Sequence, residues 1–213
     1  MKHVWRKNVL VLSLGLSLLT FSNVASAEMS RWNLDHDHTT LGFQVKHMVV
    51  SKTNGKFTDY SGFIVMDPEA EEVKAIEAVI QTKSVFTDHT KRDEHLRSLD
   101  FFDVKTFPTM TYKMKSYNKT GDVYTALGDL TLRGVTKEIT LVGTFNGVAK
   151  DPWGNTRAGF TAEGTLNRKD FGMEFSMFLD NGGLMVGDKV KLLLEIEVIQ
   201  EKKMPTVKSD YKS

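Results

Sequence analysis

The clearest strand pattern in the sequence is Lys189-Val190-Lys191-Leu192-Leu193-Leu194-Glu195-Ile196-Glu197-Val198-Ile199-Gln200, in the last quarter of the chain. Its even-numbered positions from 190 to 198 are all apolar, and lysine or glutamate fills most positions between them. Successive side chains of a β-strand point to opposite faces, so this alternation predicts a strand with one buried face and one solvated face.

Seven segments upstream repeat this two-residue alternation. They are Thr39–Met48, Gly55–Met66, Val73–Thr82, Thr109–Tyr117, Asp122–Leu132, Lys137–Ala149 and Arg157–Asn167. Most connections, such as Arg133-Gly134, are short and rich in turn residues, which favours hairpins between antiparallel neighbours. A sandwich and a barrel both fit eight such strands, but up-and-down connectivity favours the barrel because closure removes exposed edges. We predict an all-β fold, an eight-stranded antiparallel up-and-down β-barrel.

One segment, residues 88–100, is predicted to be helical. Thr90 and Asp93 resemble a capping box at its start, and Arg92, Leu96 and Leu99 share one face. The cluster Arg92, Asp93, His95 and Arg97 is rich in charge. We expect Asp93 to pair with Arg97, and Arg92 to reach Asp100 or Asp170. These salt bridges would dock the helix on the barrel rim, while the alternative is a polar latch that meets the polar head group of a bound ligand.

Composition excludes several classes of function. The 213 residues, 40% hydrophobic and 26% charged, are typical of one globular domain. A net charge of +1 does not match a phosphate backbone, so we expect no nucleic-acid partner. The absence of cysteine excludes thiol nucleophiles, thiolate metal sites and disulfides. The sequence has no nucleophile elbow, zinc-protease motif or phosphate loop, so we expect neither a cofactor nor catalysis.

The N-terminus has the pattern of a signal peptide. A basic start containing Lys2 and Arg6 precedes the apolar run Val9–Phe21, and Ala25-Ser26-Ala27 resembles a cleavage site. The run is shorter than the roughly 20 residues of a membrane span. We therefore predict cleavage of residues 1–27, a periplasmic domain over 28–200 and a polar tail over 201–213.

The interior of such a barrel can hold one slender ligand. The chain has 13 Phe and 10 Met, and these side chains suit a deformable apolar surface around a flexible guest, although they could also simply fill the core. The predicted ligand-binding residues are Phe43, Val45, Phe57, Leu96, Phe101, Phe102, Met110, Tyr112, Met114, Phe171, Met173 and Phe175.

Four blocks of sequence carry a family resemblance. They are Trp32-Asn33-Leu34-Asp35 with residues 43–47 and 55–57, residues 91–103 followed by Phe107-Pro108, residues 128–137, and residues 167–172. Their residues and order resemble the YceI-like family of bacterial exported lipid-binding proteins, over roughly Trp32 to Val198. One departure is Thr39 after His38, where the family often has serine.

The resemblance implies an extended lipocalin-like barrel that holds a polyisoprenoid or other long-chain lipid in an elongated apolar cavity. It also implies a periplasmic location. It supplies no catalytic residues, so a lipid-modifying enzyme is the least favoured alternative. Undecorated polyprenols, isoprenoid quinones and fatty amides remain alternative ligands. Carrier, storage, scavenging and stress-protection roles stay open, as do transient membrane contact and a homodimer.

A metal-binding protein is the second alternative. His36 and His38 are two residues apart, so on a strand both imidazoles would point to one face, and His47 could approach them. The competing interpretation is that these are surface or hydrogen-bonded histidines.

Overall fold

The computed structural model describes residues 28–48, 50–177 and 184–202. The predicted signal peptide, and all but the first two residues of the predicted tail, lie outside the described residues. The described strands are β1 (Ser30–Leu34), β2 (Thr40–His47), β3 (Ser51–Phe57), β4 (Tyr60–Asp67), β5 (Glu72–Gln81), β6 (Val85–Phe86), β7 (Thr109–Thr120), β8 (Val123–Leu132), β9 (Val135–Lys150), β10 (Thr156–Asn167) and β11 (Val186–Gln200). The helical elements are α1 (Thr90–Arg97) and the short 3-10 helices η1 (Thr82–Ser84) and η2 (Arg168–Phe171).

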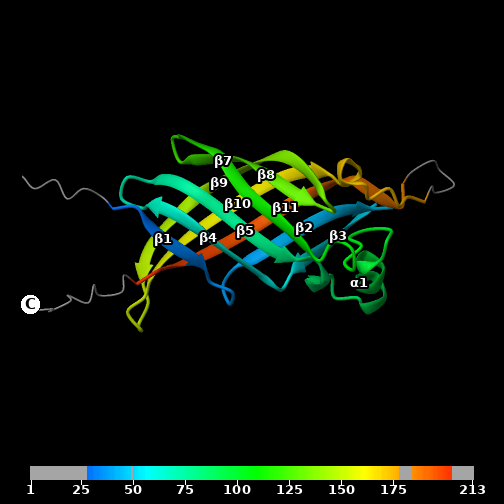
Figure 1. Cartoon of the computed structure of the whole chain (residues 1–213), viewed down its shortest axis with the longest axis horizontal. Helices are drawn as coiled ribbons and strands as arrows, with labels where there is room; N and C mark the ends of the chain where they lie inside the picture. The colour runs from blue at the N-terminus through cyan, green and yellow to red at the C-terminus, as the bar shows by residue number, and fades with distance from the viewer. Residues whose placement is uncertain (1–27, 49, 178–183, 203–213) are drawn as a thin grey trace, which may run out of the picture.

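The strands form one antiparallel sheet that closes on itself (Figure 1). β1 pairs with β4 on one side and β11 on the other, so the ring runs β1-β4-β5-β7-β8-β9-β10-β11. β11 is long enough to pair first with β2 and then with β1. β2 and β3 thereby extend the wall toward the end of the barrel that carries α1 (Figure 1). The predicted eight-stranded antiparallel barrel is confirmed.

Two details of the predicted strands differ. β1 was missed because its five residues are too few to display an alternation, although Trp32 at its centre is completely buried. The predicted strand Gly55–Met66 is divided into β3 and β4, and the chain changes pairing partner between them from β2 to β1.

The helix is confirmed as α1, but its predicted cap is wrong. The N-cap is His89, whose Nδ1 accepts a hydrogen bond from the Arg92 backbone N–H at 3.3 Å. Asp93 is only 4% exposed, and its carboxylate accepts hydrogen bonds from the backbone N–H and the Oγ1 of Thr87, at 2.9 and 2.5 Å. Asp93 therefore fixes the segment that enters the helix.

The predicted ion pairs of α1 are also wrong. Arg92 donates to Oγ1 and the carbonyl oxygen of Thr87, both at 2.7 Å. Arg97 donates to the carbonyl oxygens of Lys83 and Val85, at 2.7 and 2.9 Å. Carbonyl groups before and within the two-residue strand β6 need donors, and a guanidinium group offers five. Hydrogen bonds from arginine to the backbone, instead of salt bridges, dock α1 on the rim.

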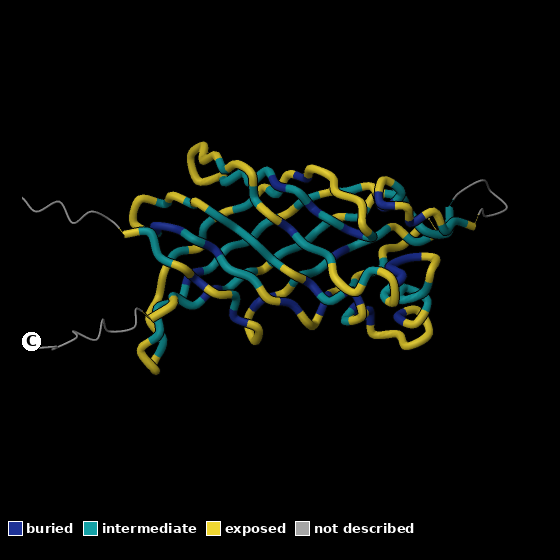
Figure 2. The backbone as a smooth tube through the Cα atoms, in the orientation of Figure 1, coloured by how far each residue is buried: buried dark blue, intermediate teal, exposed yellow. Residues whose placement is uncertain are grey.

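Residue burial varies along the barrel (Figure 2). Exposed residues gather at the turns, while much of the wall is half-buried. Several half-buried residues, such as Leu41, Ile76 and Leu141, nevertheless point inward and line a cavity. Among the described residues no helix is long and apolar enough to cross a membrane.

Candidate functional site

The barrel encloses an apolar cavity of about 570 Å³. This volume is within the usual range for small-molecule sites in proteins. Every strand of the ring contributes to its lining, together with β2, β3, α1 and the segment that follows η2. The cavity therefore depends on closure of the whole barrel.

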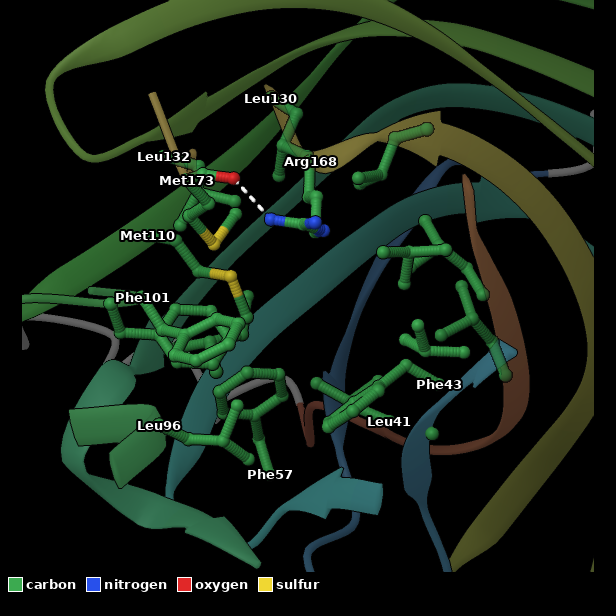
Figure 3. Close-up of a pocket in the computed structure, with 18 of the residues that line it drawn as sticks. Leu41, Phe43, Phe57, Leu96, Phe101, Met110, Leu130, Leu132, Arg168 and Met173 are labelled. Atoms are coloured by element: carbon green, nitrogen blue, oxygen red, sulfur yellow. Dashed lines mark hydrogen bonds between the residues drawn. The ribbon is translucent and has the colours of Figure 1, made fainter. Parts of the chain in front are cut away.

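Ten of the twelve predicted ligand-binding residues line this cavity. They are Phe43, Val45, Phe57, Leu96, Phe101, Phe102, Met110, Tyr112, Met173 and Phe175. Figure 3 shows side chains from α1, from the strands and from the segment after η2 converging on the same space. Their common location does not depend on a ligand, and their role in binding is taken up below.

Met114 and Phe171 are not among the lining residues. Met114 lies beside an irregularity in the pairing of β7 with β8, between Met114 and Ser116, and packs against the core. Phe171 belongs to the 3-10 helix η2 and is buried in the core cluster. The apparent alternation of Phe171, Met173 and Phe175 does not mark a strand, because η2 turns the chain there.

The aliphatic part of the lining was missed from the sequence. It includes Leu41, Ile76, Ile80, Leu130, Leu132, Ile139, Leu141, Leu166, Val186, Val190, Leu192 and Leu194. The same two-residue alternation that predicted the strands also marks these positions. They were not predicted as ligand-binding residues because leucine, isoleucine and valine at inward positions are equally typical of a filled core.

Aromatic rings from distant segments meet at the α1 end of the cavity. Phe57 lies between Phe43 and Phe102, with ring centroids 5.7 and 5.4 Å away. Phe101 and Phe175 pack at 5.3 Å, and the ring of His95 contacts both. These rings form a wall of the cavity next to α1. They do not fill the space that they surround, since all of them line the cavity.

Two glycines make room for aromatic rings inside the barrel. A Cβ atom at Gly55 would lie 2.3 Å from Cζ of Phe43, and one at Gly128 would lie 2.5 Å from Cζ of Tyr112. Neither ring could keep its position beside a larger residue. The Tyr112 hydroxyl donates to the carbonyl oxygen of Ala126 at 3.3 Å, and burial raises its pKa to about 12. Tyr112 thus stays neutral in the lining.

Arg168 is a buried cation that borders the cavity (Figure 3). Its guanidinium donates to the carbonyl oxygens of Met173 and Gly187, the latter at 3.0 Å, and to the Asp188 carboxylate at 3.1 Å. Burial lowers the pKa of Arg168 from its usual value, but these partners compensate for the charge. These hydrogen bonds hold η2 against the start of β11, so the Arg168 side chain stabilises this part of the barrel wall.

The cavity ends at a second core cluster. Trp32, Ile64, Met66, Ala158 and Val198 form this cluster, and Trp32 has no exposed surface. Ile64 also lines the cavity, whereas Trp32, Met66, Ala158 and Val198 do not. Strand β1, which carries Trp32, lies at the end of the barrel away from α1 (Figure 1). Close packing of this cluster therefore closes the cavity at that end.

At the α1 end the cavity reaches the surface. Lys46, Lys91 and Met177 belong to the lining and are exposed, and His47 lies beside them at the end of β2. The cavity is therefore a chamber with one open end, between α1 and the β2–β3 hairpin.

The two histidines of the predicted metal pair are not brought together. They lie in the turn between β1 and β2, so they do not share a strand face. The ring of His36 stacks on Tyr60 with centroids 4.6 Å apart, and His38 Nδ1 lies 2.6 Å from Oδ2 of Asp35. His47 lies apart from both, at the mouth of the cavity.

Within the described residues, one group could offer ligands to a metal ion: Asp35, His38 and Glu197. Nη1 of Arg157 donates to both carboxylates, at 2.6 Å for Glu197, so a cation already compensates for their charge. Burial would raise the pKa of Asp35, but hydrogen bonds from His38 and Arg157 outweigh it and lower the pKa. The hydrogen bond to Asp35 in turn raises the pKa of His38. This cluster ties the β1–β2 turn to β10 and β11.

Known proteins share both sequence and fold with this chain. The family model of the YceI-like domain matches residues 32–198. A UPF0312 protein of Yersinia pestis is 36% identical over 196 residues, which are 92% of this chain and 98% of that protein. The crystal structure of a Campylobacter jejuni YceI protein is 36% identical, with a TM-score of 0.64 over 79% of this chain and 97% of the other.

A more distant structure shares the fold alone. It is a domain of Saccharophagus degradans described as polyisoprenoid binding, 15% identical, with a TM-score of 0.59 over 82% of this chain and all of that domain. Sequence, fold and the order of the four motif blocks lead to the same assignment: the chain belongs to the YceI-like family.

Proposed function

We propose that this protein binds one polyisoprenoid or similar long-chain lipid inside the barrel. The observation that carries the proposal is the one-ended apolar cavity of about 570 Å³, built from every strand of the ring. The Saccharophagus degradans domain with the same fold is described as polyisoprenoid binding, which supports the same ligand class here.

The dimensions of the barrel suit an extended tail. A strand of ten residues, the length of β5 and β8, spans about 33 Å, and a tilt of about 40° leaves a barrel about 25 Å high. The tail would enter between α1 and the β2–β3 hairpin and run toward Trp32. Any head group would then stay near the open end.

The relevant competitor for the lipid is a membrane. Moving about 40 carbons out of water is worth roughly 30 kcal/mol, more than the practical ceiling of about 20 for a non-covalent complex. A bilayer already keeps the tail dry, so the net preference for the cavity depends on fit. This balance suits a carrier, a store or a scavenger that exchanges lipid with a membrane, and binding without catalysis is sufficient for each role.

The proposal extends to location and to domain limits. Export would remove residues 1–27, leaving a periplasmic lipid-binding domain over 28–200. Sequencing of the N-terminus of the protein from a periplasmic extract should begin at Glu28, whereas a full-length membrane-bound product would contradict export.

Mass spectrometry of an organic extract of the purified protein tests the ligand. We expect isoprenoid species at about one molecule per chain. Met110→Lys would place an unpaired ammonium in the apolar lining and should expel the lipid. Thr111→Lys, on the opposite face of β7, is the matched control and should retain it. A folded Met110→Lys variant with its full lipid content would contradict the proposal, with circular dichroism reporting the fold.

A further inference from the structure

The tip of the β2–β3 hairpin is an exposed apolar element at the open end of the barrel. Val50 is 86% exposed, and Met48 beside it is also exposed. The Met48 N–H donates to the Met185 carbonyl oxygen at 2.9 Å, and the Met185 N–H donates to that of Met177 at 2.8 Å. Met177 and Met185 line the cavity, so the tip is joined directly to its rim.

The same hairpin carries only positive charge. Residues 38–58 contain Lys46, Lys52 and Lys56 and no aspartate or glutamate. None of these lysines forms an ion pair within the described part of the chain, whereas Lys113 and Lys191, on the barrel wall, do. The apolar tip is therefore flanked by uncompensated ammonium groups.

An acidic turn lies at the opposite end of the barrel. The β4–β5 turn, near Trp32, contains Glu69 and Glu71, and Asp67 and Glu72 flank it at the ends of the two strands. Of these acids, Glu71 pairs with Lys119. An anionic surface would repel this end and attract the hairpin, and such an asymmetry orients a molecule as it approaches.

We propose that the hairpin tip, Met48 and Val50, docks the barrel mouth-first on an anionic lipid bilayer. Met48 and Val50, with Met177 at the rim, would enter the interface, and Lys46 and Lys52 would face lipid phosphates. Insertion of a few apolar side chains and attraction of a few basic residues are each too weak to hold a protein on a membrane. Together they give reversible attachment. The open cavity would then face the bilayer. The role of this docking rests on the proposed lipid binding, but docking itself can be measured separately.

A bilayer fits this surface better than a protein partner does. Three apolar side chains bury far less than the roughly 800 Å² that each partner contributes to a stable protein interface. A membrane demands no complementary shape, and a lysine beside an anionic surface strengthens binding about fivefold.

Flotation of the exported protein with lipid vesicles tests the proposal. One set of vesicles is phosphatidylcholine alone, and in the other phosphatidylglycerol replaces about a third of it. We expect binding to the anionic vesicles at least tenfold tighter at low salt, with the difference reduced at high salt. Equal binding to both sets would overturn the proposal.

Matched variants locate the surface. Val50→Asp should weaken binding to anionic vesicles about tenfold or more, and Lys52→Glu by a similar factor. Val148→Asp replaces an exposed valine near the C-terminal end of β9, at the end of the barrel away from the hairpin tip, and should leave binding unchanged. Equal effects of Val50→Asp and Val148→Asp would overturn the proposal, as would loss of a dimer instead of vesicle binding in sedimentation of Val50→Asp.

Lipid content separates the two proposals. Val50→Asp should retain the co-purified lipid, because Val50 does not line the cavity. Absence of lipid from the wild-type protein would contradict the proposed function but leave the vesicle measurement valid, and lipid-loaded protein that ignores anionic vesicles would overturn docking alone.

Discussion

The two ends of the barrel are built on the same continuous strands but differ in how they are filled. Near β1 and β4, Trp32 and Met66 pack with Val198 and do not line the cavity. At the other end, β2, β3 and the aromatic residues around α1 complete the wall, and their side chains leave the cavity open. Strand number sets the circumference, and the size and direction of a few side chains decide whether the interior is solid or hollow.

The largest effect is expected at the solid end. Trp32→Ala would leave a void among fully buried neighbours and should lower the free energy of unfolding by about 3 to 5 kcal/mol. Trp153→Ala, at the 79% exposed tryptophan of the β9–β10 turn, is the control and should change it by less than about 0.5 kcal/mol. Urea unfolding measures both, and equal effects would show that Trp32 does not form a packed plug.

Larger side chains should have different effects on stability at the packed end and in the cavity. Ala158→Leu enlarges a residue in the Trp32 cluster and should cost about 1 to 3 kcal/mol. Ala78→Leu enlarges a residue that lines the cavity, so it should change stability by less than about 1 kcal/mol while reducing lipid content. Thermal unfolding and lipid extraction report the two results. A larger loss of stability for Ala78→Leu would mean that the chamber is already filled by protein.

Loss of the contacts that dock α1 should lower the free energy of unfolding by less than loss of Trp32. Asp93→Ala would leave the Thr87 N–H and hydroxyl without their acceptor and should cost about 1 to 3 kcal/mol. Glu94→Ala, the exposed neighbour, should be close to neutral. Lipid content should change little. Unchanged unfolding of Asp93→Ala with loss of lipid would instead make this cluster a head-group site.

The smallest effect concerns the charged cluster around Asp35. Because the pKa of His38 is raised in the folded state, its contribution to stability is present below about pH 6.5 and is lost as pH rises through the folded value. The Asp35 pKa is lowered, so its contribution is present above about pH 4 and is lost as pH falls through the folded value. His38→Ala should therefore destabilise most between these limits.

NMR titration provides the check on this pair. The His38 pKa should lie above the ordinary value of about 6.5 in the wild type and fall toward it in Asp35→Asn. An unchanged His38 pKa in Asp35→Asn would show that the pair does not form in solution.

The barrel and the aromatic and methionine part of its lining could be predicted from the sequence. Alternation with a period of two is a local property, and it marks the inward positions of each strand without knowledge of its neighbours. Met110 and Tyr112 on β7 could therefore be assigned to the interior before β7 was paired with any other strand. Helix α1 was equally readable, because it breaks that period.

Which end of the barrel is closed, and which groups the polar side chains bind, depend on contacts between segments that are far apart in the sequence. Trp32 pairs with Gln200 across nearly the whole described chain, so no local pattern could show that it plugs one end. His36 and His38 separate because the chain turns between β1 and β2, and Arg92 and Arg97 bind backbone carbonyls that become available only when β6 ends the sheet. Such contacts depend on register and on unpaired backbone groups, which exist only after the strands have assembled.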